Sequence, residues 1–106
     1  MRKPFLIPTS FQLHGQTVTV RWDETLNSKD DARGLASFRG NEIRLQPRTD
    51  SVPAINCDIE QAFCHEMVHW ILHQMDHKLN DNEAFVNLFA NLLHQALTTA
   101  EYEKAQ

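Results

Sequence analysis

Two histidines and a glutamate lie close together in the segment His65-Glu66-Met67-Val68-His69. On an α-helix, residues four positions apart share one face, about 5–6 Å from each other. The two imidazoles can therefore bind one zinc ion at about 2.0–2.1 Å each. Glu66 follows the first histidine, so its carboxylate can reach a zinc-activated water and accept its proton without binding the metal. The segment predicts His65 and His69 as zinc ligands and Glu66 as the general base of a hydrolytic reaction.

A catalytic zinc site needs a third protein ligand and an open coordination position. We predict Glu83 as the third ligand, because it follows His69 across a short polar connection and begins a second predicted helix. Glu83 also fits the third helical position of a capping box at Asn80, an alternative that needs no metal. The ligand role requires the first helix to end by about His73 or Gln74, since a longer helix would carry Glu83 beyond the level of His69.

Other residues near the motif are weighed as alternative ligands. His73 continues the four-residue spacing but lies about 12 Å along the helix axis from His65, too far for both to bind one ion. His77 and Asp76 stay open as alternatives to Glu83. Zn²⁺ is the expected cofactor, although manganese, cobalt and nickel bind similar donors with overlapping affinities.

Three further polar residues are candidates for supporting roles. Asn87 lies one turn after Glu83, and its amide oxygen could accept the second ring N–H of a ligand histidine and fix its tautomer. An ordinary polar role near the helix–helix interface explains Asn87 equally well. His94 and Tyr102 could donate to the oxygen on which charge develops during hydrolysis. Packing or surface roles are the alternative for these two residues.

The first half of the chain, up to about residue 53, is rich in turn formers and β-branched residues, which indicates strands. Val18, Val20 and Trp22 alternate with polar residues, a pattern typical of a sheet with one buried face. Short strands are expected within about residues 11–53, at 11–13, 17–22, 35–39 and 42–45. A two-residue turn at Gly40-Asn41 is expected to join the last two strands, and residues 23–34 to form a loop.

The second half, from Cys57 onward, contains no Gly or Pro, and its apolar residues recur at helical spacing. Two helices are expected, at about residues 58–74 and about residues 81–98, the first of which carries the histidines. The apolar side of the second helix consists of Phe85, Leu88, Phe89, Leu92, Leu93 and Ala96. A small antiparallel or mixed sheet packed on two long helices makes an α+β domain.

Composition excludes several classes of function. The 106 residues suffice for one domain with a modest core. A net charge of -4 argues against binding of nucleic acid through phosphate contacts. No apolar run approaches the roughly 20 residues of a membrane span, and we expect no signal peptide. Cys57 and Cys64 are expected to be free thiols, as in a cytoplasmic protein.

The H-E-M-V-H segment, followed by D-N-E-A-F-V-N, resembles the zincin metallopeptidases of the glutamate-ligand type, the gluzincins. Gluzincins carry H-E-x-x-H on one helix and E-x-x-x-D, or a near relative, on the next. Here Glu83 and Asn87 fill the second pattern, with Asn in place of Asp. The resemblance implies His65, His69 and Glu83 as ligands, Glu66 as general base and Asn87 as the residue that holds a ligand. The size and order of elements are similar to the ImmA/IrrE-like peptidases of phages and mobile elements and to minimal gluzincins.

We therefore expect residues 1–106 to form a single zincin-like domain, a zinc metallopeptidase that cleaves a protein or peptide substrate as an endopeptidase. The alternative is a zinc-binding interaction module without turnover, because we expect no C-terminal subdomain to supply an oxyanion-stabilising residue. A metal-free helical interaction domain is a third hypothesis. The strand at 42–45, if it lies at the sheet edge, could pair with an extended peptide. The sequence does not indicate the oligomeric state.

Overall fold

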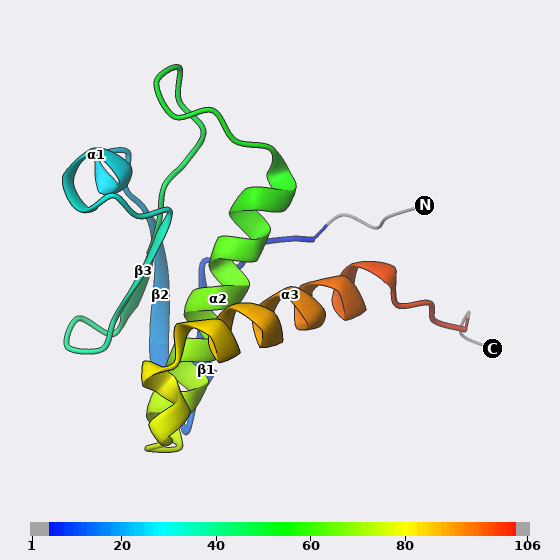
Figure 1. Cartoon of the computed structure of the whole chain (residues 1–106). Coiled ribbons are helices and arrows are strands. Elements are labelled where there is room, and N and C mark those ends of the chain that lie inside the picture. The colour runs from blue at the N-terminus through cyan, green and yellow to red at the C-terminus, as the bar shows by residue number, and fades with distance from the viewer. Residues whose placement is uncertain (1–4, 104–106) are drawn as a thin grey trace.

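The computed structural model describes residues 5–103 of the chain and has an α+β architecture (Figure 1). Its elements are β1 (Ser10–Leu13), β2 (Gln16–Trp22), α1 (Leu26–Asp30), β3 (Gly34–Ser37), β4 (Glu42–Leu45), α2 (Asn56–Gln74), the 3₁₀ helix η1 (Lys78–Asp81) and α3 (Glu83–Thr99). The sheet packs on one side of α2, and α3 crosses the other side. The predicted fold class, a small sheet with two long helices, is confirmed.

The sheet is mixed, with the strand order β1-β2-β4-β3. Strands β2 and β4 run parallel, whereas β1–β2 and β3–β4 are antiparallel pairs. Strand β4 is therefore a central strand, so residues 42–45 lack the free edge that pairing with an extended peptide would require. The edge beside α2 is formed by β3.

Two connections in the first half differ from the predicted ones. The turn between β3 and β4 has four residues, Phe38 to Asn41, instead of two, because β3 already ends at Ser37. Asn41 has a φ of 54°, a left-handed conformation that Asn tolerates better than most residues. The segment expected to be a loop, residues 23–34, contains the short helix α1, whose Leu26 is fully buried.

The core lies between the sheet and α2. Val18 and Val20 of β2 are buried as their alternation predicted, but Trp22, which continues that pattern, is 52% exposed. The indole of Trp70 is fully buried and donates from Nε1 to the backbone oxygen of Glu42 at 3.2 Å. This bond ties α2 to the central strand, so the rotation of α2 against the sheet is fixed near the histidines.

Helix α2 ends in a tight left-handed turn. Asp76 has a φ of 49°, and its N–H donates to the oxygen of His73 at 3.0 Å. The N–H of His77 donates to the oxygen of Leu72 at 2.9 Å, which completes a Schellman motif. The helix therefore stops at Gln74, as the ligand role of Glu83 requires. The chain then returns through η1 to the start of α3.

Helix α3 packs only partly through the apolar side predicted for it. Its buried residues are Val86, Ala90, His94 and Thr98. Phe85 and Leu93 of the predicted side pack half-buried against the core, whereas Leu88, Phe89 and Leu92 are 62%, 48% and 58% exposed. Small residues at Ala90 and Thr98 let the two helix backbones approach closely, which favours this face over the bulkier one.

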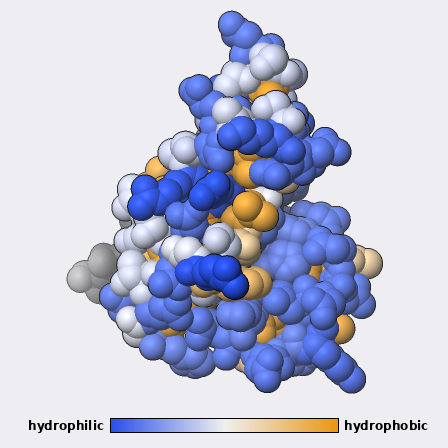
Figure 2. All heavy atoms as spheres, turned by 90° about the vertical axis from the view of Figure 1, so that its left-hand side faces the viewer, coloured by the Kyte–Doolittle hydropathy of each residue, from blue (hydrophilic) through white to orange (hydrophobic). Residues whose placement is uncertain are grey.

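The face of the molecule that carries α1 and the β3–β4 turn is mostly hydrophilic, with only scattered apolar atoms (Figure 2). Among residues 5–103, neither long helix has a stretch apolar enough to cross a membrane. Cys57 and Cys64 are free, as expected, and Cys64 is buried. Burial raises the pKa of the Cys64 thiol to about 11.

Candidate metal centre

The end of α2 and the start of α3 bring three predicted ligands together. The Nε2 atom of His65 lies 3.0 Å from one carboxylate oxygen of Glu83, and the Nε2 atom of His69 lies 2.9 Å from the other. One donor atom from each of the three residues lies within 4.8 Å of the other two. Among the described residues, this is the cluster of His, Cys, Asp and Glu side chains with the geometry to hold a metal ion.

The donors can surround one tetrahedral ion after an adjustment of the side chains. Ligands at about 2.0–2.1 Å from zinc in a tetrahedron lie roughly 3.3 Å from one another. The two N–O contacts, at 3.0 and 2.9 Å, are shorter than this and involve different oxygens of Glu83, whereas the three donor atoms together span up to 4.8 Å. The Glu83 side chain is 69% exposed, so it is free to make that adjustment. Two imidazoles and a carboxylate also form the donor set expected of a catalytic zinc site.

Glu83 takes this position because of how α3 begins. The N-cap is Asn82, whose side-chain oxygen accepts the N–H of Phe85 at 3.0 Å. Glu83 is thus the first helical residue, and the capping box that would have placed it third is not formed. Its carboxylate also benefits from the positive end of the helix dipole.

Asn80 of η1 supports the centre, a role that the sequence analysis did not give it. Its side-chain oxygen lies 2.7 Å from Nδ1 of His69. An amide oxygen accepts a hydrogen bond, so Nδ1 carries the proton in this contact, and the Nε2 lone pair would be available to a metal ion bound between His69 and Glu83. Asn87, predicted for this role, is exposed and lines a cavity together with His65, and no hydrogen bond joins it to either ligand histidine.

The carboxyl group of Glu66 is held under the sheet edge. Glu66 is only 8% exposed, and the backbone N–H of Ala36 in β3 donates to its carboxylate. Gly34 leaves room for this side chain, because a Cβ atom at residue 34 would lie 2.9 Å from Cγ of Glu66. Burial raises the pKa of Glu66 above its ordinary value, while His65, His69 and the Ala36 N–H act in the opposite direction.

Two open cavities meet at the centre. One, of about 470 Å³, extends from His65 and Glu66 toward Arg33 and Asn91. The other, of about 520 Å³, extends past His69 toward Phe38 and Asp81. Both are lined by Gly34, His65 and Glu66, so together they form one cleft that runs along β3 and passes the donors on both sides.

Comparison of the chain with protein-family models, curated proteins and solved structures found no match.

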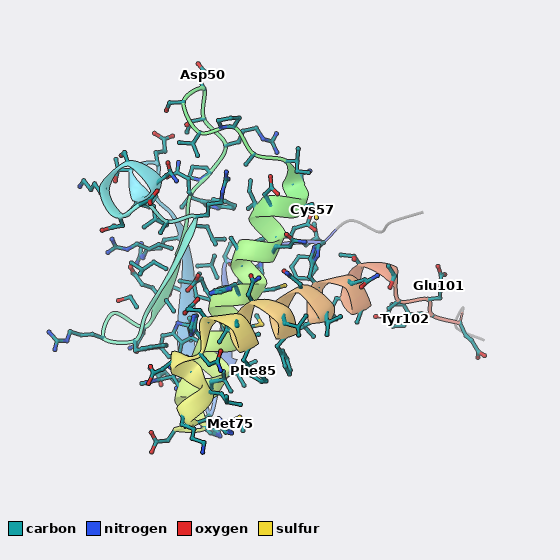
Figure 3. The ribbon with its side chains drawn as sticks, viewed as in Figure 1. Asp50, Cys57, Met75, Phe85, Glu101 and Tyr102 are labelled. Atoms are coloured by element: carbon teal, nitrogen blue, oxygen red, sulfur yellow. The ribbon has the colours of Figure 1, made fainter. Side chains whose placement is uncertain are left out.

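The other candidate residues have local structural roles. His73 stacks on Phe38, with ring centroids 3.9 Å apart. His77 accepts the N–H of Leu79 at 3.1 Å, and Asp76 forms the left-handed turn. Buried His94 contacts Glu60 at 2.7 Å, and Tyr102 is 76% exposed beyond the far end of α3 (Figure 3).

Asn80 and Gly34 could not be identified from the sequence. Asn80 stood in a polar segment, Asn80-Asp81-Asn82, in which any residue could have been the N-cap. Gly34 lay at the end of a predicted loop, where glycine is common. Both roles arise from contacts between segments that are distant in the sequence.

We predict that Asn80→Ala weakens zinc binding by about 10–100-fold, the usual effect of removing a partner of a ligand histidine. The matched variant Asn87→Ala should leave the affinity unchanged. Competition with a chromogenic chelator measures both affinities. A loss of zinc affinity in Asn87→Ala but not in Asn80→Ala would indicate that Asn87, and not Asn80, supports the ligand histidine.

A second prediction concerns the metal-free protein. Because the folded-state pKa of Glu66 is raised, the folded protein holds this proton more tightly than the unfolded chain. Wild-type stability therefore falls as pH rises from the ordinary Glu pKa of about 4.3 through the raised value. Glu66→Gln has no such loss, so its free energy of unfolding should exceed that of wild type near neutral pH. Urea unfolding with a chelator present measures this, and a difference independent of pH would contradict it.

Proposed function

We propose that the chain is a zinc-dependent metallopeptidase of the gluzincin type, with His65, His69 and Glu83 as the zinc ligands. The observation that carries the proposal is the convergence of these three donors, within 4.8 Å of one another, beside the buried carboxyl group of Glu66. A glutamate held next to two histidines and facing an open cleft has the position that a general base needs.

Zinc, when bound, would polarise the carbonyl group of a substrate and lower the pKa of a water molecule. Glu66 would accept the proton of that water and pass it to the leaving amine, because Glu66 lines both cavities beside the ligand His65. The raised pKa of Glu66 brings the group closer to the range in which one residue can both accept and donate a proton.

The shape of the cleft supports an extended peptide as substrate. Strand β3 forms one side of the cleft and is an edge strand, so a peptide could pair with it by backbone hydrogen bonds. The Ala36 N–H donates to Glu66, so this edge of the sheet faces the proposed general base. Because the cleft continues on both sides of Glu66, cleavage within a chain fits better than removal of a terminal residue.

A zinc-binding module without turnover is the second candidate. It is favoured by the positions of His94 and Tyr102, the two residues considered for oxyanion stabilisation. Neither lines the two cavities that meet at the centre. In this role Glu83 would hold the start of α3 against α2 through the metal, and zinc would stabilise the fold.

The first test is the zinc content of purified protein, measured by mass spectrometry after zinc is supplied and excess removed. We expect one zinc per wild-type chain and a strong loss in Glu83→Ala, because two histidines alone bind weakly. Asp81→Ala, an exposed residue nearby, is the matched control and should retain zinc. Zinc kept in full by Glu83→Ala would move the third ligand elsewhere, and no zinc in wild type would end the proposal.

The second test separates the two candidate functions. Glu66→Gln should retain zinc and lower the rate of peptide hydrolysis by at least about 100-fold, the scale of general base catalysis. A library of unstructured peptides with mass-spectrometric detection reports cleavage, and a chelator should abolish it in wild type. Zinc-loaded wild type that cleaves none of the peptides would favour the module. Cleavage that persists in Glu66→Gln at the wild-type rate would contradict the role of Glu66 as general base.

A further inference from the structure

Helix α3 presents an apolar stripe to solvent, formed by Leu88, Phe89, Leu92 and Ala96, with half-buried Phe85 at its beginning. Leu88 and Leu92 are about three-fifths exposed and Phe89 about half exposed. Phe85, labelled at the start of α3 in Figure 3, packs against the core and also contacts Phe89, with ring centroids 5.8 Å apart. A soluble monomer rarely leaves contiguous large side chains of this kind uncovered.

Beyond Glu83, its first residue, helix α3 carries no Asp, Glu, Lys or Arg. From Ala84 to Ala100 the sequence contains no Asp, Glu, Lys or Arg, although these make up 23% of the whole chain. A surface helix normally carries charged residues on its outer face. Depletion of charge around exposed aromatic and aliphatic residues is the composition of an interface core.

We propose that the stripe is a dimer interface, on which α3 of a second copy of this chain packs antiparallel. The sizes of the side chains are the first argument. Along α3 they decrease from Phe85 and Phe89 to Leu92 and then Ala96. A two-fold axis between residues 90 and 91 places Phe89 against the partner's Leu92 and Phe85 against the partner's Ala96. Large residues then meet small ones, as a self-complementary interface requires.

Charge is the second argument for a second copy. An interface with a different protein uses charged groups at its rim to choose that partner, and this stripe has none. Two copies each of net charge -4 can approach through an uncharged helix without local repulsion. Exposed Glu103 follows the end of α3, and exposed Lys78 precedes its start. The antiparallel arrangement therefore brings Glu103 of one copy toward Lys78 of the other.

The size of the contact sets the expected affinity. Helix α3 has 17 residues and is about 25 Å long, so a single helix pair falls below the roughly 800 Å² per partner of a standard stable interface. We therefore expect a reversible dimer with a dissociation constant in the micromolar range. Asn87 and Asn91 precede Leu88 and Leu92, so the partner helix would border the cavity that these asparagines line.

Sedimentation equilibrium of the full chain over a range of concentrations tests the proposal. Wild type should approach twice the 12.3 kDa mass of one chain as concentration rises. Leu92→Glu and Phe89→Glu should each weaken dimerisation by about 30-fold or more, the effect of losing a central contact. Leu97→Glu, at a 46% exposed leucine outside the stripe, is the matched control and should remain dimeric. Circular dichroism checks that each variant is folded.

Cross-linking tests the register separately. In a Cys57→Ser background, the double variant Phe89→Cys/Leu92→Cys should form a covalent dimer on mild oxidation, whereas Leu92→Cys alone should form much less. Wild type that stays monomeric at every concentration would overturn the proposal. The stripe would then bind a different protein or a further segment of chain. Dimers that resist both glutamate substitutions would also overturn it, because another surface would then be responsible.

Discussion

The left-handed turn at Asp76 fixes the geometry of the candidate metal centre, because it stops α2 soon after His69 and sends the chain back along the helix. One more turn of α2 would carry the start of α3 beyond the histidines. The hydrogen bonds of His73 and Leu72 with the residues of this turn hold the stop in place. Glu83 and Asn80 then reach the two histidines from a segment that would otherwise point into solvent.

The sheet contributes the second half of the site. Its edge strand β3 covers Glu66, donates to it from Ala36 and leaves it space at Gly34. Burial of a carboxyl group is unfavourable unless other groups compensate, and here an N–H and two imidazoles do so. The same strand lines the cleft. Strand β3 therefore both holds the carboxylate of Glu66 and provides the edge on which a peptide could lie.

The rotation of α3 links the metal centre to the outer surface of the molecule. At one end Glu83 must face the histidines, and further along buried His94 contacts Glu60 of α2 at 2.7 Å. These two polar constraints lie on the face that carries Val86 and Ala90, and they turn the bulky apolar residues outward. The uncovered stripe is thus a consequence of how α3 serves the site, and it is available for another role.

The sequence alone predicted the four strands, the two long helices, the fold class and the three donors that converge, because helical periodicity and the spacing of His65, His69 and Glu83 are local properties. It did not predict the short helices α1 and η1. It did not determine that Asn80 contacts His69, that Gly34 makes room for Glu66 or that β3 is the edge strand, since these depend on contacts between distant segments. The apolar side of α3 was read correctly as a pattern, yet hydrophobicity alone does not say which face packs inward. Tertiary structure decided that, because small residues and two polar contacts fit α2 better than the larger apolar face does.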